Sequence, residues 1–218
     1  MPGSLDAVMK WPLVYRMWMS PYASQKFERI LAHNDLRNVR RVLDVGCGPG
    51  TDAPQFADMD YLGIDQNERY ISHARRRHGR SFQVGDVTRL EVPTDQRFDF
   101  ILVNSLLHHI DTPSTRRLLA HLPNLLGDGG HVHVVELVLP PLSSLPRLLA
   151  RADRGDFPRP LQEWQALFAE SFDEVVFEPF DVCVGGIVFW NMVYFKGCTK
   201  PLGSPMREMQ VGIAPSSR

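Results

Sequence analysis

The chain has 218 residues, with 24 Lys or Arg against 25 Asp or Glu, so its formal net charge is -1. This balance argues against a general attraction to nucleic acid or to an anionic membrane and favours a small-molecule partner. Cys47, Cys183 and Cys198 are far apart and form no CxxC pair, so we expect neither a disulfide framework nor a metal site.

Residues 1–38 carry amphipathic helical spacing that is interrupted at Pro21. Neither this segment nor any other reaches the apolar length of a signal-peptide core or of a membrane span. The sequence therefore predicts one or two helices ahead of the first strand, in a cytoplasmic protein.

From Arg41 to about Leu139, short runs rich in β-branched residues alternate with helical spacing, which predicts βα units and a mostly parallel sheet. The expected strands are RVLDVG, YLGID, SFQVG, FDFILVN and HVHVVELVL. Between them, ERYISHARRRHG predicts a helix that stops at Gly79. The stretch TPSTRRLLAHLPNLLGDGG predicts a second helix, in which Pro123 is a candidate kink.

The composition changes after Pro140. Residues 140–171 are at first rich in proline and arginine and then resume helical spacing in LQEWQALFAESF, so we assign them to an insertion or cap. Two apolar runs follow, EVVFEPFDVCV and GGIVFWNMVYFKGC, and Gly185 and Gly186 between them predict a β-hairpin. Residues 199–218 have too little apolar content to pack and predict a disordered tail.

The stretch RVLDVGCGPGT, from Arg41 to Thr51, ends the first expected strand in a turn with three glycines. Such a turn lets a ligand approach the backbone closely and meet its N–H groups. The spacing is GxGxG and lacks the third glycine of the GxGxxG dinucleotide pattern. Asp44 would repel a pyrophosphate, but it can accept hydrogen bonds from a cationic ligand. The turn therefore favours a cationic, amino-acid-like ligand.

The spelling LDVGCGPGT resembles the first motif of class I S-adenosylmethionine-dependent methyltransferases, in the small-molecule group that includes ubiquinone-biosynthesis enzymes. The resemblance extends to Glu136 and includes NSLLHHI and LLGDGGHVHVVE. It implies a Rossmann-like α/β fold with a seven-stranded sheet in the order 3-2-1-4-5-7-6, an antiparallel last strand and helices on both faces. Residues 1–198 would form a single methyltransferase domain, with 1–38 as a helical lid and 140–171 as a cap.

The resemblance also implies S-adenosylmethionine as the cofactor, with S-adenosylhomocysteine as its product. Asp65 ends YLGID about twenty residues after the glycine turn, the separation at which an acid can meet both ribose hydroxyls. Asp86 ends the third strand, where the family uses an acid for the adenine amino group, although such an acid is also a typical helix N-cap. The expected cofactor contacts are Asp44, Gly46, Cys47, Gly48, Asp65, Gln66, Asp86, Val87 and Asn104. Cys47 is expected to fill the turn rather than to act as a nucleophile.

His108 is the leading candidate for a general base, because it follows the fourth strand on the side where the methyl group is expected. A hydroxyl or phenol acceptor needs such a base, whereas a carboxylate attacks unaided. Glu136 is a second catalytic candidate, or else it orients an acceptor or a lid. His108 and His109 could instead shape the pocket, and His131 and His133, which alternate on a strand, are expected to be structural.

The acceptor pocket is expected to be built by the segments that the common core does not supply. Tyr15 and Tyr22 lie on the first of these segments, and Arg159 lies on the second. The second segment also carries Arg147, Arg151 and Arg154. These arginines predict either a clamp for an acceptor carboxylate or phosphate or a solvated helix face.

The function predicted from the sequence is methyl transfer to a small organic acceptor, preferentially at oxygen, in specialised or lipid- and quinone-type metabolism. One alternative is a cofactor-binding regulatory or partner subunit without turnover. Another is an RNA or protein methyltransferase, which the near-zero charge and the absence of an Asn-Pro-Pro-aromatic sequence after the fourth strand disfavour.

Overall fold

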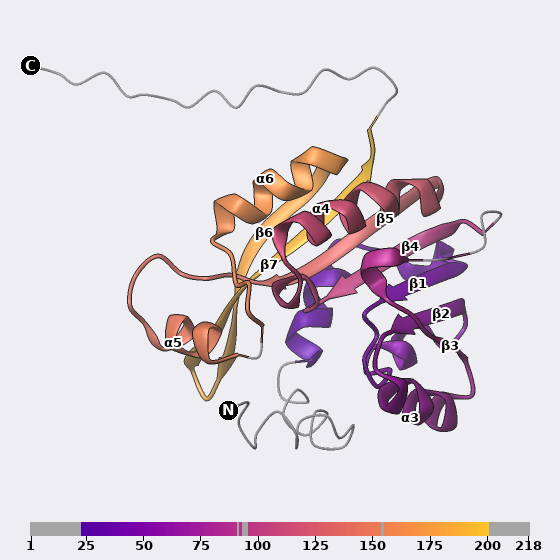
Figure 1. The fold of residues 1–218 in the computed structure, drawn as a ribbon, viewed down its shortest axis with the longest axis horizontal. Coiled ribbons are helices and arrows are strands. Elements are labelled where there is room, and N and C mark those ends of the chain that lie inside the picture. The colour runs from indigo at the N-terminus through magenta and orange to yellow at the C-terminus, as the bar shows by residue number, and fades with distance from the viewer. Residues whose placement is uncertain (1–22, 91, 93–95, 154, 201–218) are drawn as a thin grey trace, which may run out of the picture.

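The computed structural model describes residues 23–90, 92, 96–153 and 155–200. Tyr15, Tyr22, Arg154 and residues 201–218 of the predicted tail lie outside the described residues. The frame of the fold is a seven-stranded sheet in the order β3-β2-β1-β4-β5-β7-β6 (Figure 1). The strands are β1 Arg41–Val45, β2 Asp60–Asp65, β3 Ser81–Val84, β4 Phe98–Asn104, β5 Leu126–Leu137, β6 Phe172–Val184 and β7 Ile187–Thr199.

The strand directions confirm the predicted topology. All pairings among β1 to β5 are parallel, and β7 runs antiparallel to both of its neighbours, β5 and β6. Gly185 and Gly186 form the turn of the predicted hairpin, with φ angles of 58° and 80°. A side chain would strain the backbone at these angles, so the glycine pair fixes where β6 ends and β7 begins.

The helices in the described part of the chain are a helix over residues 23–32, α3 Glu68–His78, α4 Thr112–His121, α5 Leu145–Ala152 and α6 Leu161–Ser171. Short 3-10 helices are η1 Leu36–Asn38, η2 Ala53–Phe56, η3 Val87–Arg89, η4 Leu107–His109 and η5 Leu122–Leu125. α3 stops at Gly79, which adopts the left-handed conformation, as predicted. α4 passes into η5 just before Pro123, because proline has no N–H to continue the α-helix. The candidate kink is therefore a helix end.

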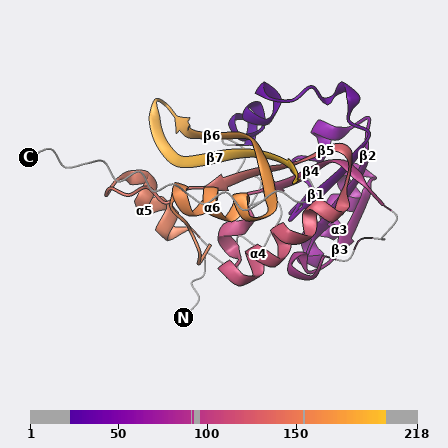
Figure 2. The ribbon, with the colours of Figure 1, turned by 90° about the horizontal axis from the view of Figure 1, so that it is seen from above.

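Helices cover both faces of the sheet (Figure 2). α4 and α6 bury Leu118 and Phe168 in a core cluster on one face. The helix over 23–32 and α3 bury Phe27 and Ile71 in a second cluster on the other face. No helix that the structure describes combines the length and the apolarity needed to cross a membrane. Burial on both faces makes the sheet a rigid platform, and the loops at its carboxyl edge carry the polar residues described next.

Candidate functional site

The glycine turn after β1 is tied to the end of β2. Gly46 N donates to Ile64 O at 2.8 Å, and Gly48 N donates to Asp65 Oδ2 at 3.0 Å. Gly46 has a φ of +77°, and a Cβ on it would lie 2.7 Å from Leu106 Cδ1. Both the backbone conformation and the close approach of the turn after β4 therefore require glycine here.

Asp44 lies buried beside this turn, with 2% of its surface exposed. Its Oδ2 accepts a hydrogen bond from Tyr61 Oη at 2.6 Å. Burial, together with the charge of Asp52, raises the pKa of Asp44 well above its usual range. No sequence pattern pointed to Tyr61, because the pair forms only when β1 and β2 lie side by side. The structure thus gives Asp44 a fixed position, and its contact with a ligand stays a prediction.

Asp65 ends β2 next to the glycine turn. Its Oδ1 accepts from Asn67 N at 2.8 Å, and its Oδ2 accepts from Gly48 N. Burial raises the pKa of Asp65, and these two backbone bonds partly offset that effect. Gln66 follows it as an exposed residue. Asp65 is thereby oriented by the turn itself, which suits a carboxylate that must meet two hydroxyl groups.

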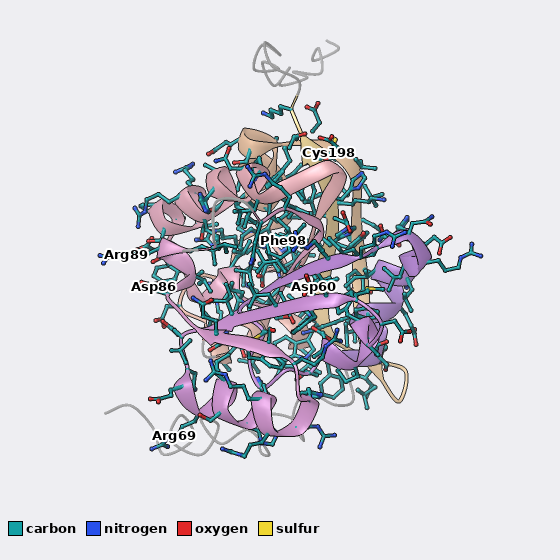
Figure 3. The ribbon with its side chains drawn as sticks, turned by 90° about the vertical axis from the view of Figure 1, so that its right-hand side faces the viewer. Asp60, Arg69, Asp86, Arg89, Phe98 and Cys198 are labelled. Atoms are coloured by element: carbon teal, nitrogen blue, oxygen red, sulfur yellow. The ribbon has the colours of Figure 1, made fainter. Side chains whose placement is uncertain are left out.

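Asp86 ends the loop after β3 and lies at the molecular surface near Arg89 (Figure 3). Its Oδ1 accepts from Thr88 Oγ1 at 2.7 Å and from Thr88 N at 2.9 Å, and these bonds lower the pKa of Asp86. Asp86 is therefore the N-cap of η3, one of the two roles that the sequence allowed. Val87 beside it is buried. Contact of Asp86 and Val87 with adenine stays a prediction.

A buried polar chain links the helix over 23–32 to the turn after β4. Lys26 Nζ donates to Ser105 Oγ at 2.7 Å, Ser105 Oγ donates to Asn104 Oδ1 at 3.1 Å, and Asn104 Nδ2 donates to Asp52 Oδ2 at 2.9 Å. Burial lowers the pKa of Lys26, and nearby carboxylates partly offset this. Ser105 has a φ of +54°, the one positive φ at a non-glycine residue within the described ranges. The sequence analysis missed Lys26, Asp52 and Ser105, because three separate segments bring them together.

His108 lies between two carboxylates. Its Nδ1 is hydrogen-bonded to Glu136 Oε1, and its Nε2 lies 2.9 Å from Asp153 Oδ2. Glu136 is fully buried, and its carboxylate also accepts from Leu107 N and Leu137 N, each at 2.7 Å. The sequence named His108 and Glu136 as separate candidates, and the structure brings them together. It missed Asp153, which reaches the site from the cap.

The two carboxylates control the proton of His108. Burial alone would lower the pKa of His108, but the charge of Glu136 and the hydrogen bonds to both carboxylates outweigh it and raise the pKa to about 9. Burial alone would raise the pKa of Asp153, but the hydrogen bond and charge of His108 lower it to about 2. The pKa of Glu136 is lowered by His108 in the same way. At neutral pH the arrangement holds His108 as an imidazolium ion.

Arg159, for which the sequence allowed either an acceptor clamp or a solvated helix face, is only 3% exposed. Its Nη2 donates to Ile110 O at 2.8 Å and its Nη1 to Leu107 O at 3.1 Å. Its guanidinium also lies over the Trp164 ring, 4.8 Å from the centroid. A solvated helix face, which the sequence also allowed, does not describe Arg159. These contacts fasten the cap to the turn after β4, and any contact with an acceptor stays a prediction.

His133 and Cys47 lie in buried environments. His133 is buried, stacks on Phe100 with ring centroids 3.7 Å apart, and has its Nδ1 3.0 Å from Tyr194 Oη. Burial lowers the pKa of His133 well below its usual range, so it is neutral. Burial likewise raises the pKa of Cys47 well above its usual range, so its thiol stays protonated. Both environments fit the structural roles expected from the sequence.

One group within the described residues could offer three ligand atoms to a metal ion. It consists of His108, His109 and Asp153, whose candidate atoms lie within 4.8 Å of one another. Both ring nitrogens of His108 already face carboxylates, so a metal would have to replace the contact between His108 and Asp153. A proton on each ring nitrogen accounts for the arrangement.

Comparison with known proteins shows which domain and which fold the chain resembles. Residues 42–130 match the family model described as a methyltransferase domain. The N-methyltransferase NodS from Bradyrhizobium japonicum WM9, solved with S-adenosylhomocysteine, has a TM-score of 0.63 at 18% identity, covering 82% of this chain and 85% of that one. Residues 42–130 therefore form a methyltransferase domain. The PH0226 protein from Pyrococcus horikoshii OT3 shares the fold of this chain, with a TM-score of 0.64 at 20% identity over 85% of this chain and 91% of that one.

Curated relatives of the chain differ in the acceptors that their names give. Trans-aconitate 2-methyltransferase of Variovorax paradoxus is 30% identical, over 56% of this chain and 48% of that protein. Fatty-acid O-methyltransferase of Mycolicibacterium smegmatis is 33% identical, over 58% of this chain and 47% of that protein. Ubiquinone biosynthesis O-methyltransferase of Acinetobacter baylyi is 29% identical, over 43% and 42%. The chain spans about half the length of these relatives, and they do not single out the ubiquinone-biosynthesis group.

The residues around the glycine turn fit the cofactor of this family. At Gly50, as at Gly46, a Cβ would crowd its neighbours, since it would lie 3.1 Å from Phe82 Cζ. Thr51 Oγ1, at the end of the turn, is buried and has no hydrogen-bond partner in the part of the chain that the structure describes. Buried hydroxyl groups are normally satisfied, so this atom fits a ligand that completes its hydrogen bonding. The turn thus combines positions that only glycine fits with a polar group that a ligand could satisfy.

Proposed function

We propose that the protein is a methyltransferase that transfers the methyl group of S-adenosylmethionine to an oxygen of a small organic acceptor. The observation that carries the proposal is the pair of Glu136 and His108 at the carboxyl edge of the sheet. Glu136 accepts the proton on His108 Nδ1, so that His108 Nε2 is the nitrogen turned toward the cap. A histidine oriented in this way is suited to take a proton from a hydroxyl group. Two of the relatives carry O-methyltransferase in their names, which supports oxygen as the acceptor atom.

We assign the cofactor to the edge formed by β1 to β4. Asp65 would accept from the ribose hydroxyls, Asp86 and Val87 would meet the adenine, and Asp44 and Asn104 would lie by the amino-acid portion. The glycine turn would contribute Gly46, Cys47 and Gly48, and Gln66 would border the ribose. When bound, S-adenosylmethionine supplies a methyl group whose bond to sulfur breaks, with the electron pair kept by sulfur, as the acceptor oxygen bonds to the methyl carbon.

The chain's own contribution is alignment, exclusion of water and a proton acceptor. The sheet and the cap bury the site, so that polar groups act at low dielectric. Glu136 fixes the ring of His108 through Nδ1, and Nε2, which faces Asp153 here, would take the acceptor's proton once it has lost its own. Removing such a base typically lowers the rate by about 10²- to 10⁴-fold.

The test begins with calorimetric titration of the full chain with S-adenosylmethionine and S-adenosylhomocysteine. A labelled-methyl screen over phenols, alcohols, carboxylates and amines follows, with wild type and His108→Gln side by side. We expect transfer to a phenol or alcohol that falls about 10²- to 10⁴-fold in His108→Gln, while transfer to any carboxylate falls much less, because a carboxylate has no proton to lose.

Other outcomes separate the alternatives. The absence of heat from either cofactor form would contradict the whole proposal. Cofactor binding without transfer to any acceptor class would favour a regulatory or partner subunit. Transfer only to RNA or to a protein, tested as further acceptors, would favour an RNA or protein methyltransferase.

A further inference from the structure

Asp153 occupies the position on His108 that a hydroxyl acceptor would need. Its Oδ2 lies 2.9 Å from His108 Nε2, opposite the Nδ1 contact with Glu136. Both partners are carboxylates that accept hydrogen bonds, so both ring nitrogens must carry protons in this arrangement. An imidazole ring with two N–H groups cannot accept a third proton. The structure therefore shows a form in which the base of the proposed function is already protonated.

The two carboxylates are held very differently. Glu136 has no exposed side-chain surface and is fixed by Leu107 N and Leu137 N in addition to His108. Asp153 has 25% of its side-chain surface exposed and lies at the C-terminal end of α5, in the cap. The contact that can open toward an entering molecule is therefore the one between His108 Nε2 and Asp153.

The cap is fitted closely over His108 by residues 155–159, which we call the closing segment. Phe157 N donates to His108 O at 2.9 Å, and a Cβ on Gly155 would lie 2.7 Å from the same oxygen. Arg159 fastens the end of the segment to the turn after β4. The acceptor must therefore enter beside His108 with the cap at least partly displaced, or displace the Asp153 side chain alone.

We propose that Asp153 keeps His108 protonated in the resting enzyme and that the acceptor hydroxyl replaces Asp153 at His108 Nε2 during turnover. This inference rests on the proposed function. Once Asp153 leaves, one of the two charges that favour the imidazolium is gone, and His108 can lose the Nε2 proton to solvent while Glu136 retains the Nδ1 proton. The acceptor's O–H bond then breaks as the methyl group is transferred, its proton bonds to Nε2, and its electron pair stays on oxygen. Asp153 is thus a positioning residue that acts through His108.

None of the other charged or titratable groups described around His108 could hold the proton on Nε2 in place of Asp153. His109, from the same turn, packs against it with ring centroids 4.0 Å apart and ring planes tilted by 42°. The charges of Lys26, on the helix over 23–32, and of Arg159, in the cap, interact with the charge of Glu136. Asp153 alone combines contact with Nε2 with a place on the cap.

The first test needs no acceptor. The ring signals of the histidines are titrated by NMR in the full chain, with EDTA present, and His108 is assigned by comparison with His108→Gln. We expect the pKa of His108 to fall by about one to three units in Asp153→Asn, which keeps the shape but removes the charge. Asp156→Asn, an exposed change in the closing segment, should leave it unchanged. An unchanged pKa of His108 in folded Asp153→Asn would overturn the proposal.

The second test measures the pH profile of kcat/KM for a phenol or alcohol that the wild type methylates. The rise of kcat/KM with pH should move to lower pH in Asp153→Asn by the same number of units, with a gain at neutral pH of about tenfold for each unit until the pKa of His108 reaches the assay pH. A uniform fall of kcat/KM at every pH, with no movement of the profile, would show a merely structural role and overturn the replacement step. If the NMR shift occurs but neither protein methylates any hydroxyl acceptor, the proposed function fails and the replacement step fails with it. In that case the proton control by Asp153 stands alone.

Discussion

Replacing Arg159 with alanine should destabilise the fold rather than act first on acceptor binding. The guanidinium is almost fully buried; it donates to Phe157 O in a partly buried bond and, in fully buried bonds, to the main-chain carbonyl groups of Leu107 and Ile110. Each of these oxygens keeps a second donor, because Ile110 N donates to Leu107 O and Thr115 Oγ1 donates to Ile110 O. Neither carbonyl is left without a partner, so the loss is that of the bonds themselves and not the larger penalty for an orphaned buried group.

The expected magnitude follows from those contacts. Two buried hydrogen bonds to a charged group contribute about 1.5 kcal/mol each at the lower end of their range, which gives about 3 kcal/mol. The stacking of the guanidinium on Trp164, at 4.8 Å, adds about 0.5 to 1 kcal/mol. The free energy of unfolding should therefore fall by about 3.5 to 4 kcal/mol. In a domain of this size, the lower figure corresponds to about 7 to 14 °C in melting temperature.

Urea denaturation followed by circular dichroism measures this change directly. Arg151→Ala provides the matched control, because Arg151 is an exposed arginine of the same cap and should change stability by no more than about 0.5 kcal/mol. Arg159→Lys keeps the charge but loses the planar fork, and it should recover only part of the loss. If Arg159→Ala unfolds like wild type while the KM for an acidic acceptor rises, the structural reasoning is refuted and the clamp predicted from the sequence is supported.

Two further predictions concern the cofactor edge and the dependence of stability on pH. Asp65→Asn should weaken S-adenosylmethionine binding by about 1 to 3 kcal/mol in calorimetry, because it removes a charged acceptor of hydroxyl hydrogen bonds. Asp60→Asn, which changes an exposed residue at the other end of β2, should bind the cofactor normally. Equal affinities in wild type, Asp65→Asn and Asp60→Asn would contradict the ribose assignment. The pKa of His108 is raised from 6.5 to about 9, so its contribution to stability is fully present below pH 6.5 and is lost as the pH rises through about 9. The free energy of unfolding should fall across that window in wild type and fall less in His108→Gln, and parallel pH curves for the two proteins would count against the ion pairs around His108.

Local patterns in the sequence determined the fold and its cofactor edge. The spacing of apolar runs predicted the strands, Gly79 and the Gly185–Gly186 pair ended elements where glycine's backbone freedom is needed, and the resemblance supplied the strand order that the structure has. The glycine turn could be recognised because its function depends on consecutive residues. Backbone conformation and close approach are local requirements, so they leave a local signature.

Only the tertiary structure decided how the charged groups pair. Tyr61 meets Asp44 across neighbouring strands, Lys26 reaches Ser105 from a helix far along the chain, and Asp153 reaches His108 from the cap. Each pair is stabilised because burial makes an unpaired charge or hydroxyl costly, and burial depends on how distant segments pack. The sequence could name His108 as a base by its position after a strand. Whether its two nitrogens carry protons depends on the carboxylates of Glu136 and Asp153, which only the folded chain brings next to it.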